Sequence, residues 1–153
     1  MRCRWAEWTA LPLVLVAPAP ILGQGRELGV TAIGTLSEPA LAVGSAYAAL
    51  RTSGRTRVSG SFGAGMAGDE FAWRGELLGH FLFSPEDPRK SGFYFAGGVA
   101  TVGGPFRRGY LVLTLGLEAR PRGGSGWAVE AGVGGGFRLA AGYRWRWFPL
   151  STQ

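Results

Sequence analysis

Cysteine, histidine and lysine each occur once in these 153 residues, and asparagine does not occur at all. The cysteine, Cys3, precedes the first apolar stretch, whereas a lipid-attachment cysteine would follow it. We expect Cys3 to be removed with an export signal, which leaves a mature chain without cysteine and excludes a disulfide framework. The single histidine, His80, excludes a multi-histidine metal site, and we expect neither metal nor cofactor.

Long basic runs are also lacking. The formal net charge is +6 and comes almost wholly from arginine, yet no run of arginine and lysine exceeds two residues. A charge of this size is typical of a protein that stays soluble or lies near an anionic surface. No nucleic-acid-binding motif occurs, so nucleic acid is only a weak alternative and is not expected as a partner.

The apolar stretch at residues 10–22 is too short to span a membrane as a helix and carries three prolines. It follows a basic start and precedes small residues at Gly23 and Gly25. This pattern predicts a cleaved signal peptide over residues 1–25, with an uncleaved interfacial anchor as the alternative.

From residue 28 onward, a sustained helical period is absent. Eight short runs instead alternate between two kinds of side chain and are separated by turn residues, with short connections that suit hairpins. We therefore expect one all-β domain over residues 26–148, an eight-stranded antiparallel up-and-down transmembrane barrel, followed by a tail of residues 149–153. The expected strands are 28–36, 40–50, 56–66, 70–83, 92–102, 109–119, 126–133 and 136–148.

The two faces of these strands differ in size and chemistry. One face is bulky and carries all four later tryptophans, whereas the other is mostly Gly, Ala, Ser and Thr with a few charges of both signs. A surface exposed to water would be richer in polar residues than this small-residue face is. A face of small residues with a few charges of both signs fits a narrow barrel interior instead, where opposite charges can pair. Arg146 shares this small face. We expect an ion-pair network in the lumen formed by Arg57, Arg74, Glu76, Glu118, Glu130, Arg138 and Arg144.

The bulky face has no room inside an eight-stranded barrel. Exposed to water it would be an aggregation hazard, whereas exposed to lipid it is the surface that a membrane barrel requires. Aromatic residues near the strand ends suit the two membrane interfaces. The expected lipid-facing aromatics are Trp73, Phe83, Phe93, Trp127, Tyr143, Trp145 and Trp147.

An export signal, eight amphipathic strands and a last strand that ends on an aromatic residue resemble the small outer-membrane β-barrel proteins of Gram-negative bacteria. The resemblance covers about residues 28–148. It implies a monomer in the cell outer membrane, surrounded by outer-membrane lipids and recognised by the outer-membrane assembly machinery through its C-terminal strand.

Two features depart from that family. Residues 149–153 follow Phe148, which has lumen parity, so either Trp147 or a Phe148 re-aimed by a bulge would serve as the recognised aromatic. The loops are short, whereas such barrels often carry long outer loops that bind partners.

Some barrels of this family resemble lipid A deacylases or acyltransferases, which use histidine with serine near the rim. His80 and Ser84 share a strand face but lie about 13 Å apart, too far for a nucleophile and its base. We expect no adjacent nucleophile for His80 and no catalytic residue. Glu118 and Glu130 could suggest glycosidase carboxylates, but with so many lumen arginines nearby we favour internal ion pairing.

The sequence thus predicts a structural or interaction barrel with a filled polar lumen. A lipid-modifying barrel enzyme is one alternative. A secreted soluble β-barrel that binds an apolar ligand is the other.

Overall fold

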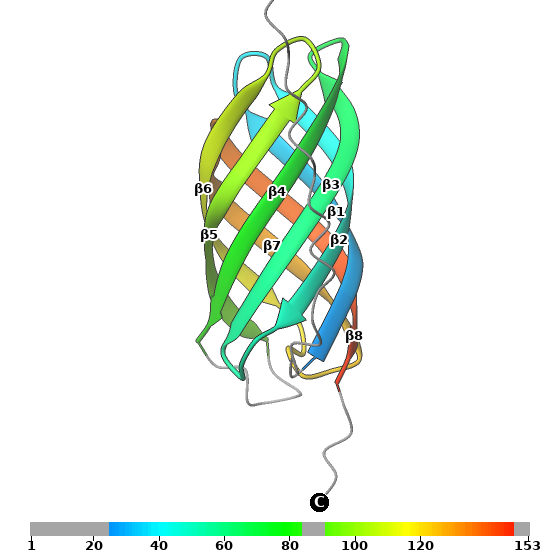
Figure 1. Ribbon diagram of the computed structural model, residues 1–153, viewed down its shortest axis with the longest axis vertical. Coiled ribbons are helices and arrows are strands. Elements are labelled where there is room, and N and C mark those ends of the chain that lie inside the picture. The colour runs from blue at the N-terminus through cyan, green and yellow to red at the C-terminus, as the bar shows by residue number, and fades with distance from the viewer. Residues whose placement is uncertain (1–24, 84–90, 149–153) are drawn as a thin grey trace, which may run out of the picture.

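The computed structural model describes residues 25–83 and 91–148, which form a closed antiparallel barrel (Figure 1). Every strand pairs with its neighbours in the chain, and β8 closes the barrel on β1. The predicted eight-stranded up-and-down topology is confirmed. The strands are β1 (Gly25–Leu36), β2 (Leu41–Arg51), β3 (Thr56–Ala67), β4 (Glu70–Leu82), β5 (Gly92–Gly103), β6 (Arg108–Glu118), β7 (Ser125–Val133) and β8 (Phe137–Trp147).

Most strand ends differ from the expected bounds, by one residue everywhere except at the start of β1. β1 begins at Gly25 rather than at Leu28, because Arg26 and Glu27 pair with the last residues of β8. Arg51 ends β2 rather than opening the following turn. Glu27 and Arg51 belong to these extensions and resemble turn residues in a sequence, but their charged side chains lie in a polar lumen here. Residues 1–24, 84–90 and 149–153, and with them most of the expected signal peptide, Ser84 and the tail, lie outside the described residues.

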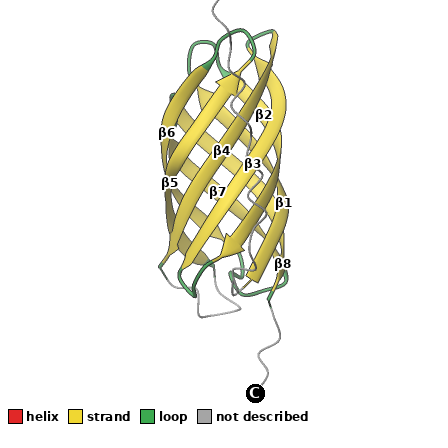
Figure 2. Ribbon diagram, viewed as in Figure 1, coloured by secondary structure: helices red, strands yellow, loops and turns green. Residues whose placement is uncertain are grey.

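Strands form the whole wall, and the loops are confined to the two ends (Figure 2). Residues 37–40, 68–69, 104–107 and 134–136 connect strands at one end, which we call the short-turn end. The first residue of β1 and the last of β8 lie at the other end, which we call the terminal end. No helix with the length and hydropathy needed to cross a membrane occurs in residues 25–83 and 91–148.

Side chains alternate between the lumen and the outer wall, as the period of an extended strand requires. Along β2, every second residue from Leu41 to Arg51 is buried and the residues between them are exposed. The lumen toward the short-turn end is filled by an apolar cluster, against which Phe106 and Tyr110 pack. This cluster consists of Ile33, Leu41, Val43, Ala67, Ala72, Val102 and Ala140.

Candidate functional site: the charged lumen

The rest of the lumen holds buried charged side chains from seven of the eight strands, together with two small apolar clusters around Leu78 and Leu82. Six arginines and four glutamates are buried there, and Arg57 has no exposed surface. Burial of so many charges requires each to be paired and hydrogen-bonded. The ten residues are Glu27, Arg51, Arg57, Arg74, Glu76, Glu118, Glu130, Arg138, Arg144 and Arg146.

Five of these residues form a group toward the terminal end, which we call the terminal cluster: Glu27, Arg51, Arg57, Glu118 and Arg146. Arg57 Nη1 lies 3.0 Å from Glu27 Oε2 and 2.9 Å from Glu118 Oε2, so it joins two carboxylates across the lumen. Arg51 Nε donates to Glu27 Oε1 at 2.8 Å. Arg146 Nη2 donates to Glu118 Oε2 at 3.2 Å. Three arginines therefore share two carboxylates.

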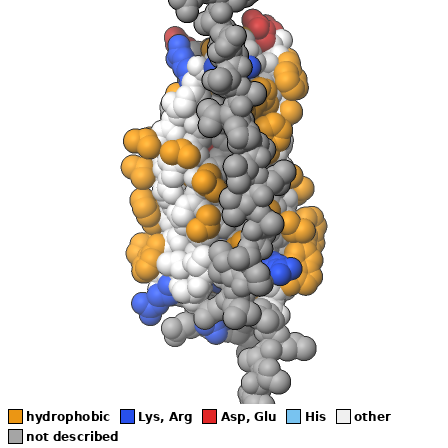
Figure 3. All heavy atoms as spheres, in the orientation of Figure 1, with side chains coloured by type: hydrophobic (Ala, Val, Ile, Leu, Met, Phe, Trp, Pro, Cys, Tyr) orange, Lys and Arg blue, Asp and Glu red, His pale blue; other side chains and the backbone are white. Residues whose placement is uncertain are grey.

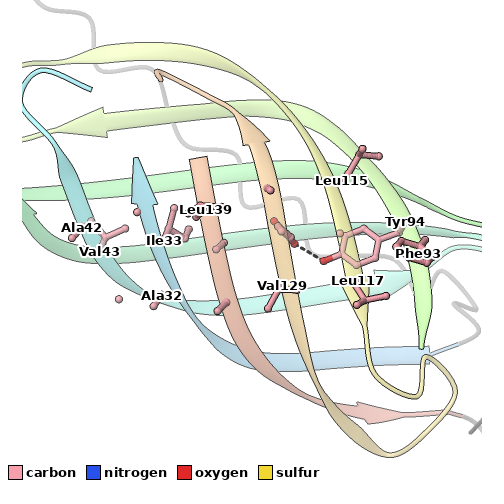
Figure 4. Close-up of a pocket in the computed structure, with 17 residues that line it drawn as sticks. Ala32, Ile33, Ala42, Val43, Phe93, Tyr94, Leu115, Leu117, Val129 and Leu139 are labelled. Atoms are coloured by element: carbon pink, nitrogen blue, oxygen red, sulfur yellow. Dashed lines mark hydrogen bonds between the residues drawn. The ribbon is translucent and has the colours of Figure 1, made fainter. Parts of the chain in front are cut away.

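A second group, the central cluster, consists of Arg74, Glu76, Glu130, Arg138 and Tyr94. Arg138 donates two parallel hydrogen bonds to Glu76, from Nε to Oε1 at 3.1 Å and from Nη2 to Oε2 at 2.8 Å. Its Nη1 donates to Glu130 at 2.8 Å. The Tyr94 hydroxyl donates to Glu130 Oε1 at 2.7 Å, the bond drawn in Figure 4. Bidentate pairing of this kind fixes geometry as well as charge.

Arg144 connects the two clusters. Its Nη1 donates to Glu118 Oε2 at 3.3 Å, and its Nη2 donates to Glu130 Oε1 at 2.9 Å. The guanidinium also lies over the rings of Tyr47 and Tyr94, at 4.5 and 5.5 Å from their centroids. Arg144 is thus held by two carboxylates and two aromatic faces, the environment that favours a buried guanidinium.

All seven residues of the expected lumen network point inward and are joined by ion pairs. The expected network was incomplete, because it omitted Glu27, Arg51, Arg146, Tyr47 and Tyr94. Arg146 and Tyr94 have lumen parity in the sequence, so alternation alone could have placed them. Glu27 and Arg51 were missed because the expected strands stopped one residue short of each.

His80 lies in the lumen beside a serine that the sequence reasoning missed. Its Nε2 is 2.7 Å from Ser59 Oγ, and its Nδ1 is 3.3 Å from Arg57 Nη2. The expectation that His80 has no adjacent nucleophile was therefore wrong. Ser59 lies on the neighbouring strand β3, where the pairing of strands and not their sequence brings it close.

The protonation of His80 follows from these contacts. A guanidinium can only donate, so Nδ1 accepts from Arg57 and carries no proton. The proton of the neutral imidazole is then on Nε2, which donates to Ser59 Oγ. This tautomer cannot accept the serine proton, which a general base must do. The pair is arranged as a structural hydrogen bond.

The expected outward aromatics all lie on the outer wall. Phe83, Phe93, Trp127, Tyr143, Trp145 and Trp147 are exposed. Trp73 is only half-buried because its ring lies over Gly103 and 5.8 Å from the ring of Phe62. Phe148, which follows β8, has its ring 5.2 Å from the guanidinium carbon of Arg51, at the mouth of the barrel.

No family model matches this chain, and no curated protein matches it. Among solved structures, the barrel is similar to the N-terminal β-barrel domain of Pseudomonas aeruginosa OprF, with a TM-score of 0.64 and 11% sequence identity. The match covers 82% of this chain and 98% of that domain. At this identity the likeness shows a shared fold, an all-β closed barrel of eight antiparallel strands.

Proposed function

We propose that this chain is an integral outer-membrane β-barrel with a filled polar lumen and a structural or interaction role. The observation that carries the proposal is the inverted distribution of side chains. Leu111 on the outer wall is 78% exposed, whereas Arg57 in the lumen is fully buried. A barrel in water would place these two side chains the other way round.

The outer wall supports a membrane environment. Large hydrophobic side chains project from it, and charged side chains gather toward the two ends (Figure 3). The strands contain 9–13 residues, and a tilted strand needs about 9–11 residues to cross the hydrocarbon core. Exposed aromatics such as Phe93, Trp127 and Trp147 lie near strand ends, where they would meet the interface.

The lumen supports a barrel that does not conduct. Ion pairs such as Arg57–Glu118 and Arg138–Glu76 join opposite walls, and the apolar cluster fills the lumen toward the short-turn end. The cavity bordered by Ser59, His80 and Arg144 has a volume of only about 10 Å³, room for about one water molecule. An apolar ligand of ordinary size has no space there, which disfavours the soluble ligand-binding alternative.

A structural role for the buried histidine supports a barrel without catalysis. Ser59 and His80 are both buried, so a lipid in the bilayer has no direct access to them. Glu118 and Glu130 are each bonded to at least two arginines, which favours the ion-pair interpretation over a glycosidase pair.

Membrane fractionation tests the proposal. The expressed full chain should stay with the outer membrane after a carbonate wash and leave it only in detergent. Its mobility on a gel should also change on heating, as the closed barrel unfolds. Recovery of a folded monomer in the soluble periplasmic fraction would overturn the proposal and favour a secreted barrel.

A further inference from the structure

A polar cavity of about 350 Å³ opens at the terminal end. It lies between the turn of residues 52–55 and that of residues 119–124. Arg51 Nη2 ties the two turns together by donating to the carbonyl oxygen of Pro121 at 2.7 Å. The ring of Phe148 covers one face of the Arg51 guanidinium. The lining residues are Arg51, Ser53, Gly54, Arg122 and Phe148.

The buried network behind this cavity carries an excess of positive charge. Six buried arginines face four buried glutamates, a difference of two positive charges, with His80 neutral. Part of this excess lies beside the cavity, because the terminal cluster holds three arginines, Arg51 among them, against two carboxylates. In a poorly polarisable interior, uncompensated charge of one sign attracts the other strongly. Arg51 belongs to this buried network and also lines the cavity.

Among the residues that the structure describes, the exposed charges around the terminal end have the same sign. They are all arginines, and Arg26, Arg120 and Arg122 are among them. The short-turn end differs, because Glu38, Asp69 and Glu70 lie there together with Arg107 and Arg108. A cationic rim around a cationic cavity raises the local concentration of anions.

We infer that this cavity is a binding site for a phosphate group. Guanidinium groups match the tetrahedral oxygens of phosphate through their N–H donors, and Arg122 lines the cavity with an exposed guanidinium. Arg51 also lines it and adds its positive charge, although its Nε and Nη2 already donate to Glu27 and Pro121. Ser53 Oγ is not counted as a ligand, because it accepts from the backbone N–H groups of Arg55 and Thr56 and is also hydrogen-bonded to Thr56 Oγ1 at 2.7 Å. The volume lies within the range of ordinary small-molecule sites.

The membrane is the nearest source of such a group. Trp145 and Trp147 are exposed on the outer wall beside this end, at the depth where a girdle of aromatics meets lipid headgroups. A phospholipid headgroup would therefore reach the cavity from the side. This source rests on the proposed function, whereas the phosphate site itself does not. A soluble phosphate ester is the other source that the same chemistry allows.

The test uses the refolded full chain in an uncharged detergent and measures its unfolding temperature from heat-dependent gel mobility. One arm adds dimyristoyl phosphatidylglycerol, with dimyristoylglycerol as the control that lacks the phosphate. The other arm adds glycerol phosphate, with glycerol and potassium chloride at matched ionic strength. A ligand that binds only the folded barrel raises its unfolding temperature. We expect stabilisation by phosphatidylglycerol, while stabilisation by glycerol phosphate alone would assign the site to a soluble ester.

Arg122→Gln should weaken phosphate binding about tenfold, the loss expected for one charge-assisted contact. Arg122 is exposed, so this variant should fold as the wild type does. Arg107→Gln removes the same charge at the short-turn end and should bind as tightly as the wild type. If both variants weakened phosphate binding equally, the effect would come from general surface charge, and the proposed phosphate site would be overturned. The site would also be overturned if no phosphate compound stabilised the barrel. If the same barrel still resisted carbonate and changed its gel mobility on heating, that result would leave the proposed function intact.

Discussion

The guanidinium carbon of Arg144 lies 4.5 Å from the centroid of the Tyr47 ring, deep in the lumen. The Tyr47 hydroxyl is buried and has no hydrogen-bond partner in the described structure. The ring, and not the hydroxyl, therefore holds the arginine that connects the two ion-pair clusters. This separation of roles can be tested directly.

Tyr47→Leu should destabilise the barrel by about 2 kcal/mol, because a desolvated cation–π contact and its packing are lost. Tyr47→Phe keeps the ring and should change the free energy of unfolding by less than about 0.5 kcal/mol. Urea titration in lipid vesicles, followed by gel mobility, measures both. If Tyr47→Phe costs as much as Tyr47→Leu, the hydroxyl has a partner that this account lacks.

Glu118→Gln should be among the most damaging conservative changes in the lumen. Its carboxylate accepts from Arg57, Arg144 and Arg146, so its loss leaves buried guanidinium charge uncompensated. The expected cost is about 3–5 kcal/mol of unfolding free energy, measured by the same titration. Glu70→Gln, which changes an exposed carboxylate at the short-turn end, is the control and should be nearly neutral. Similar small effects for the two changes would mean that water screens the lumen.

Ser59→Ala should cost about 1–3 kcal/mol, because it leaves the Nε2–H group of His80 without its acceptor in a buried site. If the pair is structural, Ser59→Ala and His80→Ala should both leave the lipid A of expressing cells unchanged in mass spectra. A lipid modification that the wild type produces and either variant loses would establish the enzyme alternative.

Gly116→Ala tests the packing of Tyr94 against Glu130. A Cβ atom at Gly116 would collide with the Tyr94 ring, so overpacking should cost about 1–3 kcal/mol. Gly44→Ala is the matched change, since a Cβ atom there meets nothing within 4 Å. It should be neutral or slightly stabilising in the urea titration. Equal stabilities would show that Tyr94 has other room in the lumen.

Much of this architecture was predictable from the sequence because an extended strand has a strict period of two. Parity alone separates Trp145 on the wall from Arg144 in the lumen, and it repeats across all eight strands. Strand ends are harder, because a charge such as Arg51 in a polar lumen looks the same in sequence as a charge in a turn.

The contacts inside the lumen could not be predicted in the same way. They depend on how far each strand is staggered against the next, which no single strand encodes. Ser59 contacts His80 because β3 and β4 pair in one register. A shift of that register would have given the histidine a different partner, whatever its parity.

The most direct test of the account is whether the bulky face meets lipid. Leu113 lies near the middle of β6 and is exposed. Leu113→Arg should lower the free energy of unfolding in lipid vesicles by about 2–4 kcal/mol, and Leu36→Arg, at the end of β1, by about 0–1 kcal/mol. The measurement is the folded fraction by gel mobility across a urea series. A Leu113→Arg barrel that folds as stably as the wild type would mean that this face lies in water, and would contradict the account.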